Sequence, residues 1–210
     1  MAFIGELREK WDSGKLPVNN EKVVSFVLAC FLKQQRDQHS QYAFEVEKIN
    51  NIGNSNHSAR FSPDVDVWEQ VQGCPMSVNA YEVKGYSGDS SNQKSKIYSG
   101  IGQALTLLTQ PYNHDPVFEH VYLAIPKQSL DRNWATAVLR AISKTPVGCI
   151  AIGLEGYETV VEADRNPFYT DNPRQTPEMV TAMVSDPKTV HRPGSGMYKR
   201  ARQLQDEFNF

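Results

Sequence analysis

The chain has 210 residues and a formal net charge of -2, and 40% of its residues are hydrophobic while 22% are charged. This length suits one domain with a substantial core, and it is too short for two ordinary domains. The composition excludes a disordered or fibrous chain, whereas a near-neutral charge neither supports nor excludes a nucleic-acid partner.

The three cysteines lie far apart and lack the paired spacing of a zinc site, so we expect free, buried thiols: Cys30, Cys74 and Cys149. Near the N-terminus, Glu6 and Arg8 interrupt any apolar run, and no other run approaches the length of a bilayer span. The sequence therefore predicts a soluble cytoplasmic protein with no membrane partner.

The first half of the chain predicts one helix followed by three strands. Residues 19–38 carry apolar side chains at spacings of three and four, which is typical of an amphipathic helix. Strand-like runs at 42–49, 60–70 and 78–86 are separated by turn-forming residues. Three successive strands suggest an antiparallel meander.

The second half of the chain alternates helices and strands. We expect a helix at 94–108, a strand at 120–125, a helix at 130–143, a buried strand at 147–154 and its hairpin partner at 157–162. The first of these helices has an apolar face made of Ile97, Ile101, Leu105 and Leu108.

This order of elements is typical of an α/β fold with helices on both faces of a central mixed sheet. We expect residues 1–163 to form that domain. Residues 164–210 are rich in proline and poor in apolar side chains. They are expected to form a C-terminal helical extension that packs on the core or contacts a partner.

Acidic and basic side chains coincide on two of the expected strands. Asp64 lies in the run from Ser62 to Trp68, and Glu82 and Lys84 lie in the next run. Because a strand projects alternate side chains to one face, Glu82 and Lys84 point the same way. Two carboxylates can hold a hard divalent cation, and a lysine can orient an attacking water or stabilise negative charge.

The residues Pro63-Asp64 and Glu82-Val83-Lys84 resemble the motif of the PD-(D/E)XK nuclease superfamily, which includes restriction endonucleases and Holliday junction resolvases. The resemblance covers the chain from the first helix to about residue 163. It implies a restriction-endonuclease-like core and a Mg²⁺-dependent DNA endonuclease, with Mn²⁺ as an alternative metal. It also implies phosphodiester hydrolysis by a metal-activated water, and a homodimer. The motif leaves open DNA or RNA, and duplex or branched substrate.

The resemblance also assigns roles to individual residues. It implies that Asp64 and Glu82 are metal ligands, that the backbone carbonyl of Val83 is a further oxygen ligand, and that Lys84 lies beside the attacking water. Asp66 shares the strand face of Asp64, so strand parity does not choose between the two. The proline-led pattern favours Asp64 and leaves Asp66 as a second ligand or a supporting group.

Two residues outside these strands resemble supporting positions of the superfamily. Glu21, in the first turn of the first helix, resembles an additional acid at the metal site, although an acid there also suits the helix dipole. Gln103 resembles a position that supports the site or contacts substrate, although a solvated helix face is an alternative. Gly100 and Gly102 would each cost about 1 kcal/mol relative to alanine inside a helix. They suggest close approach of backbone or ligand.

Four polar residues are candidates for contact with a nucleic-acid backbone: Arg60, Lys94, Lys96 and Ser99. A flexible loop around Arg60 and a solvated helix face around the other three are the alternatives.

The sequence is also compatible with a non-catalytic nucleic-acid-binding or assembly module that retains the fold. A hydrolase using histidine and serine is disfavoured, because the chain has no Gly-x-Ser-x-Gly motif.

Overall fold

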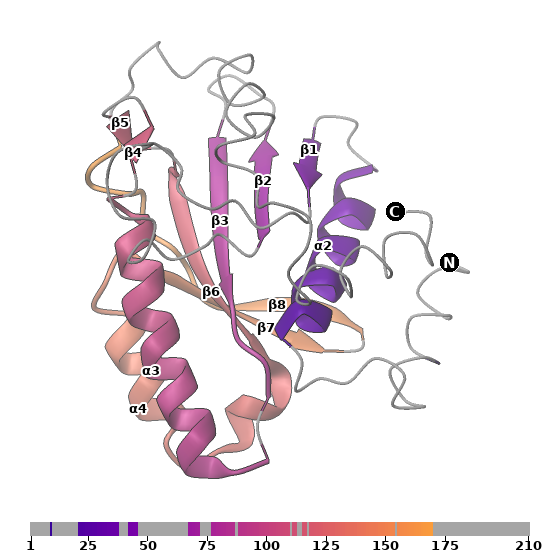
Figure 1. Cartoon of the computed structure of the whole chain (residues 1–210), viewed down its shortest axis with the longest axis vertical. Coiled ribbons are helices and arrows are strands. Elements are labelled where there is room, and N and C mark those ends of the chain that lie inside the picture. The colour runs from indigo at the N-terminus through magenta and orange to yellow at the C-terminus, as the bar shows by residue number, and fades with distance from the viewer. Residues whose placement is uncertain are drawn as a thin grey trace, which may run out of the picture.

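The computed structural model of the chain is shown in Figure 1. It describes residue 9 and residues 21–37, 42–45, 67–71, 77–86, 88–109, 111–112, 115–116, 118–153 and 155–169. Within these ranges, no helix is both long enough and apolar enough to cross a bilayer.

The first four elements are one helix and three strands: α2 (Glu21–Asp37), β1 (Tyr42–Glu45), β2 (Val67–Val71) and β3 (Ser77–Val83). The next are α3 (Ser90–Leu107), a short ribbon of β4 (Pro111–Tyr112) and β5 (Asp115–Pro116), and β6 (His120–Pro126). The last are a 3₁₀ helix η1 (Lys127–Asp131), α4 (Ala135–Ile142), β7 (Gly148–Gly153) and β8 (Gly156–Val161).

Six strands form one mixed sheet in the order β1-β2-β3-β6-β7-β8. Strands β1, β2 and β3 pair antiparallel, which confirms the predicted meander. Strand β6 lies parallel to β3, β7 lies parallel to β6, and β8 returns antiparallel to β7. Parallel neighbours need a crossover connection, and the segments containing α3 and α4 provide the two that are required.

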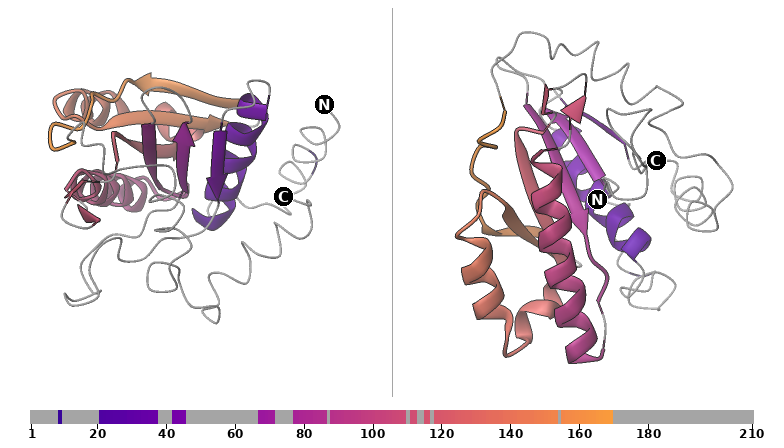
Figure 2. Two further views of the ribbon diagram at one scale, coloured as in Figure 1. Left: turned by 90° about the horizontal axis from the view of Figure 1, so that it is seen from above. Right: turned by 60° about the vertical axis from the view of Figure 1, so that its left-hand side comes forward.

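Helices cover both faces of this sheet, as predicted for an α/β fold. Figure 2 shows α2 on one face and the pair α3 and α4 on the other. Each face has its own buried apolar cluster: Val24, Leu28, Tyr81 and Val83 belong to the α2 side, whereas Ala80, Ile97, Leu123 and Val138 belong to the α3 and α4 side. Two cores therefore hold β3 rigidly between layers.

Helix α3 begins earlier than the predicted residue 94. Asp89 caps it, and its carboxylate accepts a hydrogen bond from the Asn92 backbone N–H at 2.7 Å. One turn later, Gln93 is fully buried and donates to the Ser129 hydroxyl at 3.1 Å. The polar residues before position 94 predict a loop. No local pattern indicates that Gln93 is buried, because its partner Ser129 lies far along the chain.

The buried face of α3 also differs from the predicted one. Gly100 and Ala104 face the core together with Ile97 and Leu107, while Leu105 is 36% exposed. Small residues at the contact let the helix lie close to the sheet. The pattern of large apolar side chains does not indicate such a contact face.

The helix predicted at 130–143 is instead η1 followed by α4. Between them, Arg132 has extended backbone angles, φ -81° and ψ 140°. Its guanidinium donates to the Tyr86 hydroxyl at 2.6 Å and to the Gly88 carbonyl at 3.0 Å. This long-range contact competes with local helix formation. The end of β3 also differs from the prediction, because the strand ends at Val83 and not at Tyr86.

The hairpin predicted near the end of the domain is present. Gly156 begins β8 with φ +134°, a conformation that residues with a side chain rarely adopt. Cys149 in β7 and Cys30 in α2 are buried thiols that form no disulfide, as predicted. Cys74 lies outside the described residues.

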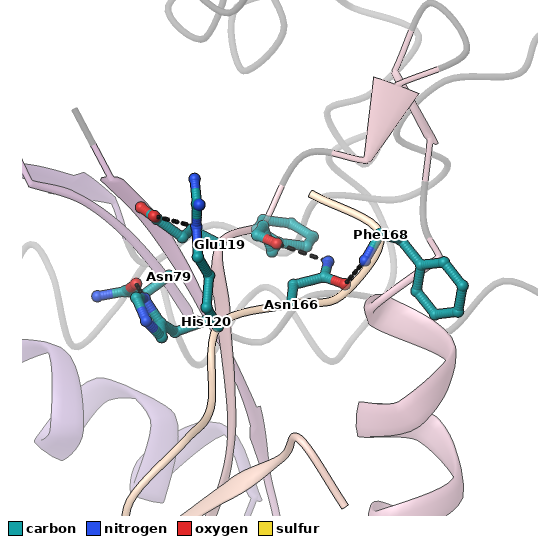
Figure 3. Close-up of polar contacts among 7 residues, drawn as sticks. Asn79, Glu119, His120, Asn166 and Phe168 are labelled. Atoms are coloured by element: carbon teal, nitrogen blue, oxygen red, sulfur yellow. Dashed lines mark hydrogen bonds and ion pairs between the residues drawn. The ribbon is translucent and has the colours of Figure 1, made fainter. Parts of the chain in front are cut away.

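The segment that follows β8 is tied to the sheet by Asn166, which is 2% exposed. Its side-chain nitrogen donates to the carbonyls of Leu108 and Phe118, each at 2.8 Å, and its backbone N–H donates to the Glu119 carbonyl at 2.7 Å. Its side-chain oxygen accepts from the Phe168 N–H at 3.0 Å. Figure 3 shows Asn166 beside the start of β6. The extension beyond residue 169 lies outside the described part of the chain.

Candidate functional site

Strand β3 places Glu82 and Lys84 at the carboxyl end of a central strand. Tyr81 and Val83 pack on the α2 side, and Ala80 packs on the α3 side. By strand alternation, Glu82 lies on the α3 side with Ala80. The backbone N–H of Lys84 donates to the Ala124 carbonyl at 2.9 Å, so pairing with β6 continues past the end of β3. The backbone that carries both charged residues is therefore fixed.

Three charged side chains converge at this point. Lys84 forms an ion pair with the Glu82 carboxylate, and its Nζ lies 3.8 Å from Oε1 of Glu21, the first residue of α2. The side chains of Lys84 and Glu82 are only 7% and 2% exposed, while Glu21 is 34% exposed. We refer to Glu21, Glu82 and Lys84 as the acid–lysine cluster. It joins the sheet to the α2 layer and is open to solvent at Glu21.

The charges of the cluster are interdependent. A buried carboxylate without a counter-charge would be strongly destabilising, and Lys84 supplies that charge. The second carboxylate, at Glu21, adds negative potential at the same ammonium. The net charge of the three side chains is negative, which favours binding of an additional cation at the exposed side.

Gln103 of α3 contributes a polar atom one helical turn after Gly100, where an added Cβ would lie 2.9 Å from Cε of Lys84. The side-chain oxygen of Gln103 is buried and has no hydrogen-bond partner within the described structure. Buried amide oxygens in folded proteins nearly always have a hydrogen-bond partner, either a protein group or an ordered water. Gln103 therefore has acceptor capacity for a further group.

The loop after Lys84 is held by residues that sequence reasoning did not single out. Arg132 packs over the Tyr86 ring at 5.3 Å from its centroid, in addition to its two hydrogen bonds. Trp134 donates from its indole N–H to the Ser90 hydroxyl at 3.1 Å. These partners lie more than 40 residues apart in sequence, so no local spacing could have indicated them.

Several predicted site residues lie outside the described residues: Asp64, Asp66 and Arg60. Of the predicted phosphate contacts, Lys94 and Ser99 are exposed and Lys96 is half-buried on α3. The Lys94 Nζ lies 5.7 Å from the centroid of the Tyr98 ring, and Tyr98 is 48% exposed.

Carboxylate oxygens are the ligands that Mg²⁺ prefers, so the acids of the cluster are the described residues that could contribute to holding a divalent cation. Glu21 and Glu82 supply two carboxylates. Among the described residues, no group of three acidic, histidine or cysteine side chains is arranged to hold a metal. A third acid would have to come from elsewhere in the chain.

The sequence matches no protein-family model, and no curated protein matches it. The function therefore has to be inferred from the residues and their geometry.

Proposed function

We propose that the protein is a Mg²⁺-dependent DNA endonuclease with a restriction-endonuclease-like core, in which Mn²⁺ can replace Mg²⁺. The observation that carries this proposal is the convergence of Glu21, Glu82 and Lys84 at the end of β3. The order of α2, three antiparallel strands, α3 and a parallel strand agrees with the order of elements on which the resemblance is based.

Four groups would hold the metal ion: the carboxylates of Asp64, Glu82 and Glu21, and the carbonyl of Val83. Asp64 shortly precedes β2 in the sequence, and the first residue of β2, Val67, pairs with Tyr81, the neighbour of Glu82. When bound, the ion would polarise a phosphate oxygen and lower the pKa of an attacking water.

Lys84 has the role of stabilising charge on the phosphate. Its ammonium is nearly removed from solvent, and electrostatic interactions are stronger in such an environment. As the water adds to phosphorus, negative charge develops on the phosphate oxygens, and a fixed ammonium beside them lowers the barrier. Gln103 would accept a hydrogen bond from a water or complete the contacts of the ion.

Helix α3 is the surface that we propose for the DNA backbone. Its only charged residues are Lys94 and Lys96, and it contains no acid. Together with Ser99 and the exposed Tyr98 ring, they offer ammonium, hydroxyl and aromatic groups, which are typical of phosphate and base contacts. Arg60 is proposed to contribute a further phosphate contact.

We also propose that the enzyme acts as a homodimer, because cutting both strands of a duplex requires two sites. Sedimentation velocity in the presence of duplex DNA should then give a species with two chains. A single chain per duplex would contradict the dimer and leave the chemistry intact.

Cleavage of supercoiled plasmid and four-way-junction DNA in Mg²⁺ tests the activity. Glu82→Gln and Lys84→Met should each lower the rate by about 100-fold or more, as removal of one stabilising group does elsewhere. Glu158→Gln and Lys127→Met are matched controls, because Lys127 and Glu158 form an exposed ion pair at 3.3 Å. Both control variants should cleave DNA at the wild-type rate. Equal rates for all five proteins would reject the proposal.

The alternative function is a non-catalytic nucleic-acid-binding module. The observation that favours it is the close pairing of Lys84 with Glu82, which a purely structural ion pair would also show. This alternative predicts DNA binding with no cleavage in either Mg²⁺ or Mn²⁺.

A further inference from the structure

We infer that Gly100 is a positioning residue for Lys84. Because Gly100 has no side chain, it leaves the space beside helix α3 through which the lysine side chain extends toward Glu82 and Glu21. The catalytic consequence rests on the proposed nuclease function, whereas the positioning itself does not.

The geometry at Gly100 is tight on the side that faces the sheet. A Cβ atom at this position would lie 2.9 Å from Cε and 3.0 Å from Cγ of Lys84, and 2.7 Å from Cδ1 of Leu123. Carbon atoms pack at about 3.5–4.0 Å. The lysine stem therefore occupies the volume that any other residue at position 100 would need.

The lysine stem has little room in which to retreat. Lys84 is 6% exposed, its backbone is hydrogen-bonded to β6, and Leu123 is fully buried beside it. Its Nζ is also held by the ion pair with Glu82. An added methyl group at position 100 would have to displace the aliphatic chain of Lys84, and the displacement would move Nζ relative to both carboxylates.

Gly102 shows that this explanation is specific to position 100. It lies on the same helix, it is exposed, and a Cβ there would meet nothing within 4 Å. Both substitutions remove the same backbone flexibility from the unfolded chain. Any difference between Gly100→Ala and Gly102→Ala therefore reports the contact with Lys84 and Leu123.

Reductive methylation of lysines, followed by mass spectrometry of the peptides, reports how well the ion pairs and burial protect Nζ. In the full-length wild-type protein Lys84 should react slowly, with the exposed Lys127 as the internal reference. In Gly100→Ala, Lys84 should react at least about tenfold faster, as loss of one charge-assisted hydrogen bond gives. In Gly102→Ala its rate should equal that of wild type. Unchanged protection of Lys84 in Gly100→Ala would overturn the inference.

A double-mutant cycle covers the case in which Gly100→Ala folds poorly. Replacing Lys84 with alanine removes both stem atoms that the new methyl group would meet. Gly100→Ala should lower the unfolding midpoint in the wild-type background and lower it much less in the Lys84→Ala background. Equal effects in both backgrounds would show that Leu123, and not Lys84, requires the glycine.

DNA cleavage adds the readout that depends on the proposed function. Gly100→Ala should lower kcat by about 100-fold with KM nearly unchanged, because a misplacement of about 1 Å has that effect on a reacting group. Faster methylation of Lys84 without any cleavage by the wild-type protein would sustain the positioning role and reject the nuclease. Faster methylation with full cleavage activity would reject the catalytic consequence alone.

Discussion

Lys84 and Lys127 each pair with a glutamate, but the two ion pairs differ in their exposure to water. The pair of Lys84 with Glu82 is almost fully buried, whereas the Lys127 and Glu158 side chains are 60% and 49% exposed. Water screens the exposed pair, and the buried pair depends on each partner to compensate for desolvation of the other.

We therefore predict unequal effects of the same substitution. Lys84→Met should lower the free energy of unfolding by about 3–5 kcal/mol, because it leaves the Glu82 charge buried without its main partner. Lys127→Met should lower it by no more than about 1 kcal/mol. Urea unfolding monitored by tryptophan fluorescence measures both values. Similar losses for the two variants would mean that the acid–lysine cluster is solvated.

Cys149 provides a pH-dependent test of burial at the same scale. Burial raises the pKa of its thiol from the ordinary 9.0 to about 12. Below pH 9 the thiol is protonated in both the folded and the unfolded chain, so it adds no pH dependence. Between pH 9 and 12 only the unfolded chain releases the proton, so stability falls as pH rises.

The wild-type protein should accordingly lose up to about 1.4 kcal/mol of stability per pH unit above pH 9 through this thiol. Cys149→Ala should lack that contribution and show a shallower slope. Urea unfolding at pH 8, 9 and 10 compares the two proteins. Parallel slopes would indicate that the thiol is accessible to solvent in the folded state.

At the residue scale, strand alternation placed Glu82 and Lys84 on one face, as their ion pair requires. Glu21 was suggested by the resemblance to the nuclease superfamily and not by a local period. Arg132 and Gln93 escaped notice because their partners are Tyr86 and Ser129, distant in sequence. A polar residue gives no local sign that it will be buried.

At the scale of elements, Asn166 joins three parts of the fold. One side-chain amide satisfies the last turn of α3 and the segment before β6, and it also binds the turn at Phe168. Backbone carbonyls buried at helix and strand ends need such donors. The residue substitutes for a secondary-structure hydrogen bond where none can form.

Asn166→Asp tests this role with almost no change in volume. The carboxylate cannot donate to the carbonyls of Leu108 and Phe118, so the variant should lose at least about 2 kcal/mol of unfolding free energy. Asn133→Asp, at an exposed position between η1 and α4, is the matched control and should stay within about 0.5 kcal/mol of wild type. Thermal and urea unfolding measure the difference. Equal stability of the two variants would contradict the role of Asn166.

The sequence predicted which segments form helices and which form strands. It predicted less well where these elements end and which of their residues face the core. Periods of two and of three to four residues identified the helices and strands. The start of α3 and the break before α4 depend on long-range hydrogen bonds of Gln93 and Arg132, so local patterns placed them wrongly. The buried face of α3 differs from the predicted one because it includes two small residues, Gly100 and Ala104, which a pattern of large apolar side chains does not indicate.

At the scale of the whole molecule, two apolar layers enclose β3 and determine where the cluster lies. The antiparallel meander brings β2 beside β3, and the parallel crossover brings α3 across the other face. A class of α/β fold could be inferred from the order of elements. The strand order could not, because β6 joins β3 through contacts between residues about 40 positions apart.

We propose that the acid–lysine cluster belongs to a divalent cation site, and calorimetric titration with Mn²⁺ in the absence of DNA is the test of this claim. Wild-type protein should bind Mn²⁺ at one site per chain, and Glu82→Gln should weaken that binding at least about tenfold, the scale on which loss of a charged ligand acts. Glu158→Gln should bind like wild type. Absence of Mn²⁺ binding, or equal affinity in all three proteins, would contradict the claim.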